Sequence, residues 1–154
     1  MVPGLHAGRQ FMAGRTTDMA QQDTLDLIGR YYAAFNAGDR EGFLALLADD
    51  VIHDINQGGR EIGRDAFRRF LERMDSAYAE QLKDIVIMAD ESGNRAAAEF
   101  IVHGKYLKTD EGLPEAKGQT YILPAGAFFE VRDGKVSRIS NYYNLEDWLK
   151  QVAG

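Results

Sequence analysis

The sequence predicts an α+β fold in which helices come first and long antiparallel strands follow. Helical apolar spacing recurs before about residue 80, and extended apolar runs fill most of the chain after it. This segregation argues against a parallel α/β fold, in which the two element types alternate. The Asp133-Gly134 pair between two apolar runs is a strong hairpin signal and marks the centre of the expected sheet.

Three helices are expected in the first half of the chain. The first begins at Asp23 as its N-cap and ends near Gly38, with apolar residues at i, i+3, i+4 and i+7 spacing. Asp39 caps a second, short helix. A third spans residues 64–79 and carries one apolar stripe. Residues 1–21 precede these helices as a weakly patterned extension of a single domain, residues 22–154.

The expected strands are short before the third helix and long after it. In the strand 120–131, both faces carry apolar side chains, which is typical of a strand covered on both sides. Helices would cover one face, and a second subunit is one candidate for the other. A short helix over residues 145–152 ends the chain. The expected strands are residues 51–55, 83–89, 95–107, 120–131 and 136–143.

Composition narrows the functional classes. The 154 residues carry a formal net charge of −6 and no basic stripe, which argues against a nucleic-acid partner. With no cysteine, disulfides, thiolate metal sites and thiol catalysis are excluded. No apolar run approaches the length of a membrane helix, and residues 1–21 contain no signal-peptide core, so we expect a cytoplasmic protein with no membrane partner.

Motifs for metal, phosphate and serine chemistry are missing from the sequence. The three histidines lie far apart without ligand spacing, and neither a Gly-rich phosphate loop nor a nucleophile elbow is present. What remains is acid/base chemistry in a pocket, because a curved sheet closed by helices leaves a concavity at one end.

Several segments carry a family resemblance. Residues 30–39, 47–50, 53–54 and 63–67 resemble the first half of ketosteroid isomerases and of SnoaL-like proteins, both of the nuclear-transport-factor-2-like (NTF2-like) superfamily. Residues 112–118 look more like SnoaL-type polyketide cyclases. The resemblance implies a cone-shaped, curved antiparallel sheet wrapped by the three N-terminal helices, and a homodimer formed through the outer face of that sheet.

The resemblance also implies catalytic positions. By its spacing to Gly63, Asp54 matches the family's general base, and Tyr31 matches the tyrosine that donates to the oxyanion. Gly126 stands where the isomerases carry a second, protonated acid. Asn144 lies near the acid/base Asp of the cyclases, and an amide cannot transfer protons as a carboxylate does. Neither family's full set is present.

Each candidate has a structural alternative. A buried Asp54 would have a raised pKa, which suits a base, but the residue could equally bond a neighbouring loop. Tyr31 could be a core residue with a satisfied hydroxyl. If the strand alternates, His53 points away from the face of Asp54, as a surface or interface residue. The candidate substrate-binding residues are Phe70, Phe100, Val102, Gly126, Phe128, Asn141, Tyr143 and His103. For the four aromatic rings among them, Phe70, Phe100, Phe128 and Tyr143, core packing is the default.

The function that these residues favour is cofactor-free isomerase or cyclase chemistry on a small apolar carbonyl compound. Asp54 would take a proton from the carbon beside the carbonyl, and Tyr31 would donate to the enolate oxygen. A non-catalytic domain that binds a small apolar molecule, or a dimeric interaction domain, is the alternative, because a fold alone does not assign function.

Overall fold

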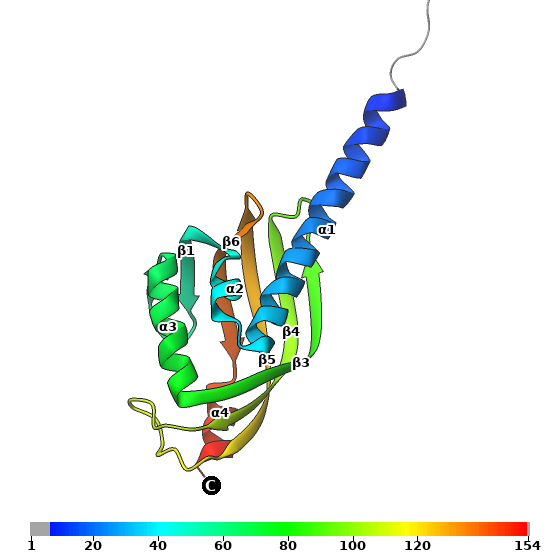
Figure 1. Cartoon of the computed structure of the whole chain (residues 1–154). Helices are drawn as coiled ribbons and strands as arrows, with labels where there is room; N and C mark the ends of the chain where they lie inside the picture. Colours follow the sequence, from blue (N-terminus) through cyan, green and yellow to red (C-terminus); the bar gives the residue numbers. More distant parts are fainter. Residues whose placement is uncertain (1–6, 154) are drawn as a thin grey trace, which may run out of the picture.

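The computed structural model describes the backbone of residues 7–153 and the side chains of residues 19–153. Four helices and six strands lie in this part of the chain, and the helices α1, α2 and α3 pack on one face of a curved, unclosed sheet (Figure 1). In chain order the elements are α1 (Ala7–Ala37), α2 (Arg40–Leu44), β1 (Leu47–Ile55), β2 (Arg60–Ile62), α3 (Arg64–Ala77), β3 (Tyr78–Ala89), β4 (Arg95–Tyr106), β5 (Thr120–Arg132), β6 (Lys135–Tyr143) and α4 (Leu145–Val152).

The six strands form one sheet in the order β2-β1-β6-β5-β4-β3. The strands after α3 make an antiparallel meander, and β1 joins its open side by pairing parallel with β6. The predicted α+β class, with helices before a long antiparallel sheet, is confirmed. Because β1 and β3 lie near opposite edges of a curved sheet, their inward side chains approach the same concave space from two sides.

The central hairpin is the best predicted part of the fold. Asp133 and Gly134 have φ angles of 52° and 71°, the left-handed pair that a two-residue hairpin turn of the favoured twist requires. Along β5, Tyr121 and Phe129 are buried, whereas Ile122 and Phe128 on the opposite face are 58% and 50% exposed. The helices cover one face of the strand, and the second apolar face lies at the surface of this chain.

The first helix is longer than predicted. It begins at Ala7, and Asp23 lies inside it, so the predicted N-cap is wrong. The preceding residues are rich in Ala, Gln, Met and Arg, which propagate a helix readily. The helix end is as expected: Gly38 takes a φ of 70°, and Asp39 caps α2 by accepting a hydrogen bond from the Gly42 amide at 2.9 Å.

The junction between α3 and β3 also differs from the prediction. The helix ends at Ala77 and the strand begins directly at Tyr78, five residues before the predicted start. The predicted strand over 51–55 begins at Leu47, and the short strand β2 was not predicted. The early start of β3 matters for the site, because it makes Glu80 an alternating strand residue on the inward face of Leu82.

A core of aliphatic and aromatic side chains fills the space between the helices and the inner face of the sheet. Helix α4 covers the end of the sheet with Trp148, which is buried. Asn144 caps this helix by accepting from the Asp147 amide at 3.1 Å, so a local structural role accounts for its side chain. Among the described residues, no helix has the length and apolarity needed to cross a bilayer.

Candidate active site

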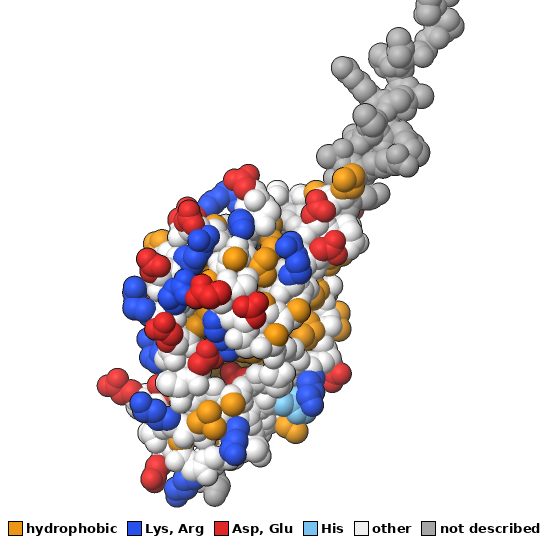
Figure 2. Space-filling view, viewed as in Figure 1, with side chains coloured by type: hydrophobic (Ala, Val, Ile, Leu, Met, Phe, Trp, Pro, Cys, Tyr) orange, Lys and Arg blue, Asp and Glu red, His pale blue; other side chains and the backbone are white. Residues whose placement is uncertain are grey.

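A cavity of about 760 Å³ lies between the helices and the concave face of the sheet. Side chains from α1, α2 and α3, aromatic residues and arginines among them, form one side, and residues of β1, β3, β4, β5 and β6 form the other. Figure 2 shows the molecular surface hollowed below α2 and α3, with hydrophobic and acidic side chains at the opening.

Asp54 borders this cavity, but its carboxylate turns to the outer face of the sheet. Arg60 binds it through two hydrogen bonds of 2.6 and 3.0 Å, and Arg138 approaches to 3.4 Å. The Arg60 hydrogen bond, assisted by the charges of both arginines, lowers the pKa of Asp54 below its ordinary value. The condition under which Asp54 would have a raised pKa, burial beside apolar side chains, is therefore not met.

His53 takes the inward place instead. Its side chain is buried between the rings of Phe67 and Phe70, at centroid distances of 4.6 and 4.5 Å, and it lines the cavity. The expectation of a surface or interface histidine is wrong, because β1 alternates in the opposite phase: Val51 and His53 face the core, whereas Asp54 faces the arginines.

Glu80 of β3 brings a carboxylate to the inner face of the sheet. The Tyr121 hydroxyl donates a hydrogen bond of 2.9 Å to Glu80 Oε2, and both side chains line the cavity. Burial raises the pKa of Glu80 above its ordinary value of 4.5, although the hydrogen bond from Tyr121 opposes this shift. Glu80 therefore has the environment expected of a proton-transfer group, which Asp54 lacks.

Gly104 makes the contact between Glu80 and Tyr121 possible. The three residues form one row across the sheet, because Glu80 pairs with Gly104 and Gly104 pairs with Tyr121. A Cβ at Gly104 would lie 2.1 Å from Tyr121 Cζ and 2.5 Å from its hydroxyl oxygen. The missing side chain thus lets the tyrosine lie flat across β4 and reach the carboxylate two strands away.

Other polar groups surround this pair. The Tyr78 hydroxyl donates to Asp110 Oδ2 at 2.9 Å, and both residues line the cavity with Tyr143. Burial raises the pKa of Tyr78, Tyr121 and Tyr143, so all three phenols stay protonated at neutral pH and each has a hydrogen to donate. The carboxylate end of the cavity is therefore rich in neutral donors.

The wall formed by α1 carries two more phenols. Tyr31 is buried against Phe43 and Phe129, and burial raises its pKa above the ordinary value. The neighbouring Tyr32 has a buried hydroxyl with no hydrogen-bond partner among the described residues. Both residues line the cavity.

The predicted binding residues divide between the two faces of the sheet and the core. Phe70, Val102, Asn141 and Tyr143 line the cavity, and Phe100 packs in the core at 5.3 Å from the Tyr32 ring. Three predictions need correction, because strand alternation places the residues on the outer face, away from the cavity wall. These residues are His103, Gly126 and Phe128, each paired with outward-facing neighbours.

Sequence reasoning missed Glu80, Tyr121 and the inward position of His53. Glu80 fell between a helix predicted to end at residue 79 and a strand predicted to begin at residue 83. Alternation with Leu82 was the available signal for its inward direction. The glycine in the middle of β4 was a second signal, because such a residue often marks a close approach.

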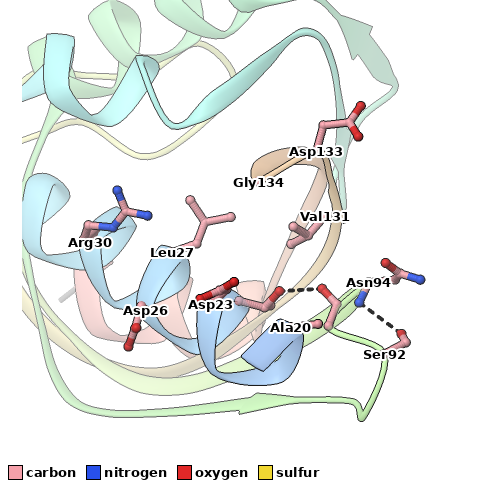
Figure 3. Close-up of a pocket in the computed structure, with 12 residues that line it drawn as sticks. Ala20, Asp23, Asp26, Leu27, Arg30, Ser92, Asn94, Val131, Asp133 and Gly134 are labelled. Atoms are coloured by element: carbon pink, nitrogen blue, oxygen red, sulfur yellow. Dashed lines mark hydrogen bonds between the residues drawn. The ribbon is translucent and has the colours of Figure 1, made fainter. Parts of the chain in front are cut away.

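A second hollow, of about 670 Å³, lies where α1 meets the β3–β4 and β5–β6 turns (Figure 3). The Thr24 hydroxyl donates to the Gly93 carbonyl oxygen, and a Cβ at Gly93 would lie 2.4 Å from the Ala20 carbonyl oxygen. This close approach joins the helix to the turn, and we interpret the hollow as the seam between them.

Metal ligation has no evident basis in the described part of the chain. Among residues 19–153, no three His, Asp or Glu side chains come together as ligands for an ion.

Comparison with known proteins finds one matching family and similar solved structures. The SnoaL-like domain family matches residues 28–139. A “putative polyketide cyclase” from Pseudomonas putida KT2440 is 60% identical, with a TM-score of 0.83 over 84% of this chain and 97% of that protein. No curated protein matches the sequence.

More distant structures share the architecture. An NTF2-like protein from Burkholderia xenovorans LB400 is 20% identical, with a TM-score of 0.69 over 86% of this chain and 97% of that one, which shows the fold alone. A “putative ketosteroid isomerase” from Kribbella flavida is 26% identical, with a TM-score of 0.60 over 80% of this chain and 79% of that one.

Proposed function

We infer that this chain, which belongs to the SnoaL-like domain family, catalyses isomerase- or cyclase-type proton transfer on a small apolar carbonyl compound. One observation carries the proposal: Glu80, a carboxyl of raised pKa, is held by Tyr121 on the wall of an apolar cavity. A carboxylate in such surroundings is a stronger base than an exposed one. The names of the similar polyketide cyclase and ketosteroid isomerase structures support the reaction class.

In the proposed reaction, Glu80 takes the proton from the carbon beside the substrate carbonyl, and the bonding electrons become an enolate. For an isomerisation of an unsaturated substrate, the enolate is conjugated to the double bond, and Glu80 returns the proton to the far carbon of this dienolate. For a cyclisation, the enolate carbon attacks a second carbonyl of the same molecule, and Glu80 returns the proton to the alkoxide that forms. The proton and the electron pair stay within the protein and substrate, so no cofactor takes part.

Two tyrosines assist in this scheme. Tyr121 positions the Glu80 carboxylate through its 2.9 Å hydrogen bond. Tyr31 remains our proposed donor to the enolate oxygen, because it lines the cavity and burial keeps its hydroxyl protonated. A donor aimed at a developing oxyanion commonly contributes about 2.7–4 kcal/mol to transition-state stabilisation.

The experiment that tests the proposal is α-proton exchange of 2-tetralone in D2O, followed by NMR. The wild-type protein should accelerate deuterium incorporation, and Glu80→Gln should slow it by at least about 100-fold, the contribution typical of a general base. Asp54→Asn is the matched control and should keep near wild-type exchange. Exchange that survives Glu80→Gln contradicts the proposal, and a loss confined to Asp54→Asn restores the assignment of the base to Asp54.

A binding module without turnover is the second candidate, favoured by the extent of the apolar lining. It predicts that 2-tetralone raises the melting temperature of the protein, since a ligand of the native state stabilises it, while the exchange rate stays at the buffer value.

We also propose that the protein forms a homodimer through the outer face of the sheet. This face exposes the large apolar side chains of Val86, Ile122, Phe128 and Tyr142, and exposed apolar groups on one face are typical of protein interfaces. Sedimentation velocity should find a dimer for the wild type and a monomer for Phe128→Asp, which buries a charge in the contact. A wild-type monomer at micromolar concentration contradicts this proposal.

A further inference from the structure

Arg73 is a cation at the cavity that the proposed reaction does not use. Two arginines line the cavity, and Asp75 neutralises one of them, Arg40, through hydrogen bonds of 2.6 and 2.7 Å. Arg73 forms no salt bridge with any of the described residues. The protein therefore compensates the charge of one guanidinium at the cavity and leaves the charge of the other to solvent or to a ligand.

An aromatic ring orients Arg73. Its guanidinium carbon lies 5.4 Å from the centre of the Phe70 ring, within the range of a cation–π contact. Phe70 is itself held by an edge-to-face contact of 4.5 Å with His53. The Arg73 side chain is thus exposed but rests on a packed part of the cavity wall. A side chain held in this way loses less conformational freedom when it binds a ligand.

The positive charge of Arg73 acts on this part of the cavity wall. Burial lowers the pKa of His53, and the charge of Arg73 acts in the same direction. The side chains of Asn56 and Gln57, which directly follow β1, line the cavity as well and add amide donors. Helix α3 packs against β1 through the contact of Phe67 with His53. This side of the cavity therefore presents a positive charge and neutral donors, which suit an anionic oxygen.

The Glu80 side of the cavity has the opposite charge. Glu80 and Asp110 both line it, and neither forms a salt bridge with the described residues. An anionic group of a ligand would be repelled there and attracted at Arg73, so the two sides together orient an anionic ligand.

The chain path limits the distance between the two sides. Arg73 lies in α3, and β3 follows this helix directly (Figure 1). The path from Arg73 to Ala77 is about 6 Å and the path from Ala77 to Glu80 is about 10 Å, so the Cα atoms of Arg73 and Glu80 lie at most roughly 16 Å apart. Both side chains line the cavity and shorten this gap, so a ligand of one or two rings can contact both.

We propose that the substrate is a keto acid, and that Arg73 binds its carboxylate while the reacting carbon beside the carbonyl faces Glu80. This inference rests on the proposed function for the role of Glu80. A planar guanidinium matches the two oxygens of a carboxylate. Arg73 determines specificity and takes no part in the proton transfer. The chain has a formal net charge of −6, which opposes the binding of an anion, so a preference for the acid has to come from a local contact.

The test compares a keto acid with its uncharged ester, 6-carboxy-2-tetralone and the methyl ester, in calorimetric binding at pH 7. Wild-type protein should bind the acid about tenfold more tightly, the effect of one charge-assisted contact at an exposed site. This preference should shrink between about 50 and about 500 mM NaCl, because salt screens an exposed pair.

Variants of two arginines locate the contact. Arg73→Gln should bind the two probes equally, and Arg73→Lys, which keeps the charge, should still prefer the acid. Arg69→Gln is the matched control: Arg69 lies one turn earlier on α3 and is exposed, but it does not line the cavity, so this variant should keep the wild-type preference. Both glutamine variants should melt close to the wild type, because the replaced side chains are exposed.

The same binding comparison in Glu80→Gln separates the two proposals. The preference for the acid should persist in this variant, since Arg73 acts on binding. If the preference is present while α-proton exchange is missing even in the wild type, the proposed function fails and the Arg73 site stands. The Arg73 proposal is overturned if wild-type protein binds the two probes equally, prefers the ester or binds neither. A preference that survives Arg73→Gln, or that is lost to the same extent in Arg69→Gln, overturns it as well.

Discussion

Replacing Gly104 with alanine places a Cβ atom where the Tyr121 ring now lies. The new carbon would stand 2.1 Å from Tyr121 Cζ, whereas non-bonded carbons settle at about 3.5–4.0 Å, so the ring must withdraw by more than about 1 Å. A withdrawal of that size breaks the 2.9 Å hydrogen bond to Glu80. Overpacking typically costs about 1–3 kcal/mol, and hydrogen bonds to charged groups contribute about 1.5–3 kcal/mol.

We therefore expect Gly104→Ala to lower the free energy of unfolding by about 2–4 kcal/mol in urea titrations, because part of the strain relaxes as the ring moves. The rate of α-proton exchange of 2-tetralone should fall together with the stability. Gly59→Ala is the matched control, since a Cβ there meets no atom within 4 Å, and its stability should change by less than about 0.5 kcal/mol.

Two outcomes would refute this reasoning. The first is a Gly104→Ala protein with wild-type stability and exchange. The second is additivity of Gly104→Ala and Tyr121→Phe. Both changes act on the same hydrogen bond, so the double variant should lose less than the sum of the two single losses.

Three further predictions concern stability and its pH dependence. Tyr32→Phe should leave the unfolding free energy unchanged or raise it by up to about 1 kcal/mol in urea titrations, because the buried hydroxyl has no described partner; a large loss would reveal one. The folded-state pKa of Glu80 is raised, so the native state holds the proton more tightly than the unfolded state does. The contribution of Glu80 to stability therefore falls as pH rises above 4.5. Glu80→Gln should flatten this decline in melting curves between pH 4 and 8. The pKa of Asp54 is lowered, so its ion pairs stabilise the fold above pH 3.8, and this stabilisation is lost as pH falls through the folded-state pKa. Asp54→Asn should cost under about 1 kcal/mol at pH 7, and the cost should shrink as the pH is lowered below 3.8 in melting curves.

The fold was predictable from local pattern, because each main element carries its own signal. Asp133-Gly134 specifies a turn, and the two-residue alternation around Tyr121 and Phe129 specifies the buried face of β5. Gly38 and Asp39 specify the boundary between two helices. The start of α1 was missed because Asp23 looks like a cap, and the helix-favouring residues before it outweigh that signal.

The site was harder to predict, because it depends on contacts between distant elements. In β1 both faces carry an aliphatic residue, so alternation alone does not decide between His53 and Asp54. The arginines that draw Asp54 outward come from β2 and β6, 6 and 84 residues away. Glu80 and Tyr121 are 41 residues apart and meet only through the sheet register at Gly104.

The central claim is that Glu80 is the general base. Its most direct test is a pH titration of Glu80, in which NMR monitors the chemical shift of the carboxyl carbon in protein labelled with ¹³C-glutamate. Glu80→Gln assigns the signal. We expect Glu80 to titrate above 4.5, and the rate of 2-tetralone exchange to rise with pH at the same midpoint. A Glu80 carboxyl that titrates at or below 4.5, or an exchange rate whose midpoint differs from that titration, would contradict the account.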